Sequence, residues 1–113
     1  MPKTPFAAMI TNLPQADIAF KGVTGWLSQA KDHQVVFMDI APIGEVAPHA
    51  HGAQWGIVVD GEMELTIGNK TQVYRKGDSY FIPKGTVHAA RFRTRTFVID
   101  VFADKNRYRK RKA

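Results

Sequence analysis

At 113 residues, with 44% hydrophobic and 23% charged residues, the chain has the size and composition of one globular domain. The absence of cysteine excludes disulfides, thiolate metal sites and cysteine nucleophiles. The net charge of +6 is not spread over the chain, since residues 1–104 carry ten basic and ten acidic side chains, and this argues against a domain built to bind nucleic acid.

Residues 1–33 form a predicted N-terminal segment with weak local signals. Val23–Gln29 fits a strand, and we expect the segment to pack on the rest of the domain or on a partner copy. Residues 1–5 lack the apolar stretch of a secretory signal, and no run approaches the roughly 20 apolar residues of a membrane helix. We therefore expect a cytoplasmic protein without membrane contact.

Residues 34–104 are predicted to be all-β, because short apolar runs alternate with turn signals such as Asp60-Gly61 and Gly68-Asn69. The predicted strands are Gln34–Ile40, Trp55–Val59, Glu62–Ile67, Gln72–Tyr74, Ser79–Ile82, His88–Phe92 and Thr96–Phe102. Strands this short cannot stand alone. They predict a double-sheet barrel or jelly roll that surrounds a small cavity.

Three histidines and a glutamine are candidate ligands for one metal ion. His49 and His51 are two residues apart, so that both imidazoles leave the same face of a strand. Gln54 joins them if Gly52 and Ala53 form a bulge or kink, and His88 completes the set. Nitrogen and oxygen ligands of this kind suit a divalent transition metal, with Fe, Mn, Zn, Ni and Cu all open.

The lining of the cavity is predicted from strand parity. Residues that share a face with His88 or Gln54 point inward, and they make a mainly apolar pocket from Gly56, Val58, Ala90 and Phe92. Asp100 interrupts the last apolar run. It either faces solvent on an edge strand, which we favour, or points into the barrel as a general base whose pKa is raised by burial.

The last part, residues 105–113, is a basic tail. Its six positive side chains are Lys105, Arg107, Arg109, Lys110, Arg111 and Lys112. We expect a solvated, frayed end. Weak contacts with nucleic acid are the alternative, although no helix-turn-helix pattern or aromatic platform accompanies the tail.

Two motifs resemble the signatures of the cupin superfamily, over roughly residues 34–102. The first comprises Gly44, His49, His51, Gln54 and Gly61, and the second comprises Gly77, Pro83, Gly85 and His88. Gln54 stands where most members carry Glu, and Phe92 replaces the usual terminal Asn. The resemblance implies a double-stranded β-helix barrel of the cupin type and a metal on the four candidate ligands. It also implies a homodimer, formed by sheet packing or N-terminal strand exchange.

Two functions from different classes remain open. The first is a small metalloenzyme that acts on a carbonyl, uronate-like or aromatic substrate as a dioxygenase, isomerase or lyase, with Asp100 as the residue that moves a proton. The alternative is a non-catalytic module that binds or senses a sugar-like small molecule. Cupins of both kinds resemble this chain.

Overall fold

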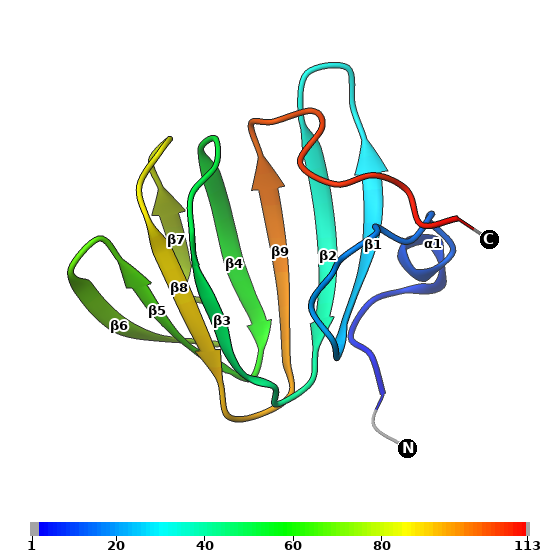
Figure 1. Cartoon of the computed structure of the whole chain (residues 1–113). Coiled ribbons are helices and arrows are strands. Elements are labelled where there is room, and N and C mark those ends of the chain that lie inside the picture. Colours follow the sequence, from blue (N-terminus) through cyan, green and yellow to red (C-terminus); the bar gives the residue numbers. More distant parts are fainter. Residues whose placement is uncertain (1–2, 113) are drawn as a thin grey trace.

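The computed structural model describes residues 3–112, which form one short helix and nine strands (Figure 1). The helix is α1 (Ala8–Thr11), and the strands are β1 (Val23–Gln29), β2 (Gln34–Ile40), β3 (Gly44–His49), β4 (Gln54–Asp60), β5 (Glu62–Ile67), β6 (Lys70–Arg75), β7 (Ser79–Ile82), β8 (His88–Phe92) and β9 (Thr96–Phe102). The all-β prediction is confirmed. Within these residues, no helix has the length and apolar character needed to span a membrane.

The strands form two antiparallel sheets that enclose one hydrophobic core (Figure 1). The longer sheet has the order β1-β2-β9-β4-β7, and the shorter one has the order β3-β8-β5-β6. The chain crosses between the sheets after β2, β3, β4, β6, β7 and β8. Such repeated crossing is the architecture of a jelly roll, so the predicted barrel is confirmed.

Alternation along the strands decides which side chains turn inward. In β2 the inward residues include Gln34, Val36 and Met38, all buried, while the residues between them are partly exposed. Val36 pairs with Asp100 of β9, which is only 3% exposed. The favoured solvent-facing edge position of Asp100 is therefore wrong, because β9 lies between β2 and β4 and Asp100 has the parity of its buried neighbours.

The basic tail is held against the body of the protein. Backbone hydrogen bonds and an isolated bridge join residues 15–17 to residues 109–111. The fully buried side chain of Gln34 adds two more, accepting from the N–H of Tyr108 at 3.0 Å and donating to its carbonyl at 2.8 Å. The expectation of a frayed tail is wrong up to Arg111, because its backbone groups find partners far away in the sequence.

β3 is missing from the predicted strand ranges, although His49 was expected to lie on a strand. It lacks the alternation that marks the others, since most of its residues are exposed, and Pro48 interrupts its backbone ladder. Its register against β8 shifts between Val46 and His49. This irregular strand nevertheless carries the first of the candidate ligands.

Candidate metal centre

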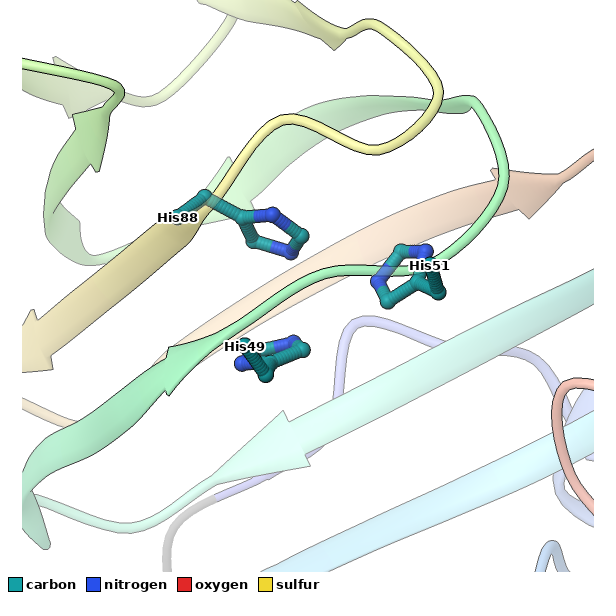
Figure 2. A group of neighbouring side chains, drawn as sticks. All are labelled: His49, His51 and His88. Atoms are coloured by element: carbon teal, nitrogen blue, oxygen red, sulfur yellow. The ribbon is translucent and has the colours of Figure 1, made fainter.

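Three histidine side chains converge at one end of the barrel (Figure 2). His49 ends β3, His88 begins β8, and the two are register partners. His51 follows in the connection to β4. One nitrogen atom from each ring lies within 4.8 Å of the others. A single metal ion could bind all three.

His49 and His51 do not share a strand, contrary to the prediction. β3 ends at His49, and residues 50–53 lead from the shorter sheet to the longer one. Gly52 lies in this connection, where its N–H donates to Oδ2 of Asp104 at 2.8 Å and a Cβ atom would collide with that carboxylate. The predicted bulge is thus a crossing between sheets, and it aims His51 at the other two rings (Figure 2).

All three imidazoles are held in one tautomer. Nδ1 of His49 bonds to the carbonyl of Ala47 at 2.9 Å, Nδ1 of His51 to that of Gly52 at 2.8 Å, and Nδ1 of His88 to that of Thr86 at 2.9 Å. A carbonyl oxygen only accepts, so each Nδ1 carries the proton and each Nε2 presents a lone pair. Nδ1–H bonds of this kind orient metal-ligating histidines.

The surroundings of His51 and His88 favour the neutral form of both rings. Burial is the largest cause that lowers the pKa of His51 and of His88. A backbone hydrogen bond opposes this in each case, while the positive charge of Arg107 lowers both pKa values further. Nε2 of His51 is buried and has no hydrogen-bond partner among the described residues. A buried lone pair left in this way fits a metal ion.

A cavity of about 80 Å³ lies inside the barrel, next to the three histidines. Most of its wall is apolar, and Ala90 and Phe92 belong to it, as strand parity predicts. Gly56 and Val58 do not border it: Val58 is packed in the core, and the space over Gly56 is occupied by Asp100 and Tyr80. The polar residues that line the cavity are His49, His51, Gln54, Tyr80, His88, Asp100, Arg107 and Tyr108.

Asp100 and Tyr80 form a buried hydrogen-bonded pair in this cavity. The Tyr80 hydroxyl donates to Oδ1 of Asp100 at 2.6 Å. Burial raises the pKa of Asp100 to about 6, against the hydrogen bonds from Tyr80 and Gln54, which lower it. Burial and the charge of Asp100 raise the pKa of Tyr80 well above its usual value, so Tyr80 remains a donor.

Gln54, the fourth predicted ligand, begins β4 and is 9% exposed. It lines the same cavity as the three histidines, and its side chain also reaches Asp100. The amide therefore lies between the histidine cluster and the carboxylate. From this place its oxygen can face an ion while its nitrogen donates to Asp100.

Arg107 and Tyr108 are cavity residues that sequence reasoning assigned to a solvated tail. Both lie in the segment that Gln34 holds in place. A signal was present, because Gln34 is a polar residue on a strand whose other inward positions are apolar. Its partner could not be identified without the fold.

A jelly-roll barrel with histidines from two separate motifs at one end defines a cupin. Residues 36–102 match the family described as the cupin domain, so the chain belongs to this family. A curated relative from Bacillus subtilis, named H2HPP isomerase, is 34% identical over 82 residues. That match covers 71% of this chain and 35% of the relative, so the chain spans about a third of that protein's length.

Solved structures support the same fold. An RmlC-like cupin from Shewanella frigidimarina has a TM-score of 0.70 at 25% identity, covering 79% of this chain and 82% of that one. KdgF from Halomonas sp. also has a TM-score of 0.70, at 24% identity, covering 77% of this chain and 84% of that one. The similarity extends over most of each chain, as expected for small single-domain cupins.

Proposed function

We propose that this cupin is a metal-dependent enzyme that acts on a small oxygenated substrate. Its ligands are Nε2 of His49, His51 and His88 together with the amide oxygen of Gln54. The observation that carries this assignment is the convergence of three lone pairs whose Nδ1–H groups are fixed by backbone carbonyls. Such a set suits divalent Fe, Mn, Zn, Ni or Cu, and the bound ion supplies Lewis acidity toward a substrate oxygen.

The reaction that the remaining residues support best is an isomerisation by proton transfer. Asp100 removes a proton from the carbon beside a carbonyl and returns it to another atom of the same molecule. One C–H bond breaks and another bond to hydrogen forms, so no oxidant or reductant is required. Tyr80 and Gln54 hold the carboxyl group in place. The isomerase name of the Bacillus subtilis relative supports this class.

Proton exchange with solvent tests this function. Protein purified without an affinity tag is analysed for metal and then incubated in D₂O with 2-butanone, pyruvate, galacturonate or catechol. We expect stoichiometric metal, and deuterium at the carbon beside the carbonyl in NMR spectra, lost after chelation and restored by the metal. Protein that cannot be loaded with metal would contradict the assignment. Saturable binding without exchange or turnover would favour the non-catalytic binding module, and consumption of catechol would favour a dioxygenase.

We also infer that two copies associate through the outer face of the longer sheet. Trp55 of β4 and Phe81 of edge strand β7 are register partners with 42% and 57% of their surface exposed. Neighbouring aromatic residues of that face, in contrast, are covered by Phe6 from the same chain. Exposed apolar residues side by side are typical of an interface.

Light scattering at micromolar concentration checks the association. We expect the mass of a dimer for the wild type and of a monomer for Phe81→Ser, because the substitution removes a large aromatic side chain from the proposed contact. Val87→Ser is the matched control, since Val87 is 54% exposed but lies in the connection between β7 and β8. A monomeric wild type would contradict the inference.

A further inference from the structure

Arg107 occupies the mouth of the barrel. It lines the cavity that contains the histidine cluster, and it also lines an outer depression that Phe20, His49, His51 and Tyr108 share. Arg107 thus borders both the cavity and the outer depression beside the histidines.

The position of this side chain is fixed by its surroundings. The guanidinium carbon lies 4.4 Å from the ring centroid of Tyr108 and 5.8 Å from that of Phe102. The backbone of Tyr108 is held by Gln34 in both directions. A cation stacked on aromatic rings and anchored at its backbone is ordered before any ligand arrives.

The charge of Arg107 has no counter-ion among residues 3–112. No carboxylate lies within ion-pair distance of it, and its Nε is buried without a hydrogen-bond partner. The two nearby carboxylates are engaged elsewhere: Asp104 accepts from Gly52, and Asp100 accepts from Tyr80. A buried donor left unpaired is costly, and a ligand that supplies an acceptor recovers that cost.

The charge balance of the site requires an anion. Imidazoles bind a metal ion as neutral ligands, and Gln54 contributes a neutral amide where a glutamate would bring a negative charge. A divalent ion held by these four groups keeps its full charge, and Arg107 adds one more. In a small, mostly apolar cavity, positive charges of this kind attract a negatively charged partner strongly.

We propose, on the basis of the function proposed above, that Arg107 binds the carboxylate of the substrate and that the substrate is a small carboxylic acid. A planar guanidinium matches a carboxylate with two parallel N–H···O bonds. The acid carries a second oxygen, a carbonyl or hydroxyl, that faces the histidine cluster. With a cavity of about 80 Å³, the reacting part of the molecule is only a few atoms long.

Calorimetric titration with pyruvate and with its uncharged methyl ester tests the role of Arg107. Each is titrated into chelator-treated protein and into protein loaded with Zn²⁺. The variants are Arg107→Met, which removes the charge but keeps an apolar side chain over Tyr108, and Arg107→Lys, which keeps a point charge without the planar fork. Lys105→Met is the matched control, because it removes one charge from an exposed residue outside this cavity.

We expect the wild type to prefer pyruvate over methyl pyruvate in both metal states. Arg107→Met should weaken pyruvate binding about 10- to 100-fold, which corresponds to the loss of charge-assisted hydrogen bonds. The affinity for methyl pyruvate should stay unchanged. Arg107→Lys should fall in between, and Lys105→Met should match the wild type. Equal weakening for both compounds, or equal binding of both by the wild type, would show that Arg107 only packs on Tyr108 and would overturn the assignment.

The two proposals fail separately. One outcome is that the protein takes up no metal and, after chelator treatment, still prefers pyruvate through Arg107. In that case the proposed metal-dependent activity is disproved and the proposed carboxylate site stands. If metal binds and 2-butanone exchanges its protons while Arg107→Met binds pyruvate as the wild type does, the proposed activity stands and the carboxylate site is disproved.

Discussion

Replacing His51 with alanine is expected to eliminate metal binding and, with it, all metal-dependent turnover. Nε2 of His51 is buried, carries a lone pair and has no protein partner, so the substitution removes a ligand for which the fold offers no substitute. Losing even a residue that only supports a ligand costs about 10- to 100-fold in metal affinity, and we expect a larger loss here. Metal content should fall from about one ion per chain to below a tenth.

The fold itself should survive, because His51 lies in a connection between sheets and is only partly buried. The control is His33→Ala, which removes a partly exposed histidine whose ring is hydrogen-bonded to the side chain of Asp32. Thermal unfolding adds a second measurement, since metal should raise the Tm of the wild type and of His33→Ala but not that of His51→Ala. A His51→Ala protein with full metal content would disprove the proposed ligand set.

The second large effect is expected from Asp100→Asn. Asparagine preserves the shape of the side chain and can still accept from Tyr80, but it cannot take a proton. General bases contribute about 10²- to 10⁴-fold, so deuterium incorporation into a carbonyl substrate should slow by that factor while metal content stays near that of the wild type. Unchanged exchange would remove Asp100 from the mechanism.

The pH dependence of stability distinguishes a chemical role of Asp100 from a structural one. Its pKa in the folded protein, about 6, lies above the ordinary value of 3.8, so the folded state favours the neutral acid. This stability is fully present below pH 3.8 and is lost as the pH rises through 6. Between pH 4 and pH 8, metal-free wild type should lose about 2 kcal/mol more unfolding free energy than Asp100→Asn does.

At pH 8 the variant should therefore be as stable as the wild type or more so, even though it is nearly inactive. Urea unfolding at several pH values measures the difference. Exposed Asp60→Asn serves as a control that should follow the wild type at each pH. A variant that is clearly less stable at pH 8 would assign the lost turnover to a folding defect.

Most of the fold could be predicted because local signals and the final packing agree. Gln34–Ile40 and Thr96–Phe102 have the predicted limits, since apolar residues fill them and turns follow. β3 was missed because its side chains are mostly exposed and show no regular alternation. The direction of Asp100 was misjudged for a related reason: both faces of β9 are rich in apolar residues, so composition does not say which face is inside.

The candidate site was partly predictable for similar reasons. The histidine spacing indicated a common ligand site, and the three rings do converge. The approach of Arg107 to the cavity was out of reach, because it depends on hydrogen bonds between Gln34 and Tyr108, 74 positions apart. Local pattern carries no information about pairings of that range. The segment was judged on its charge alone.

The hold of Gln34 on Tyr108 also has an evolutionary consequence. The histidines come from residues 49–88, whereas Arg107 comes from a short stretch that is held by Gln34 and by the backbone pairing of residues 109–111 with residues 15–17. If Arg107 selects the acid as proposed, substitutions in that stretch can change which acid binds while the three histidines stay in place. Related proteins that share all three histidines but differ at Gln34 or Arg107 should have diverged in the compounds they accept.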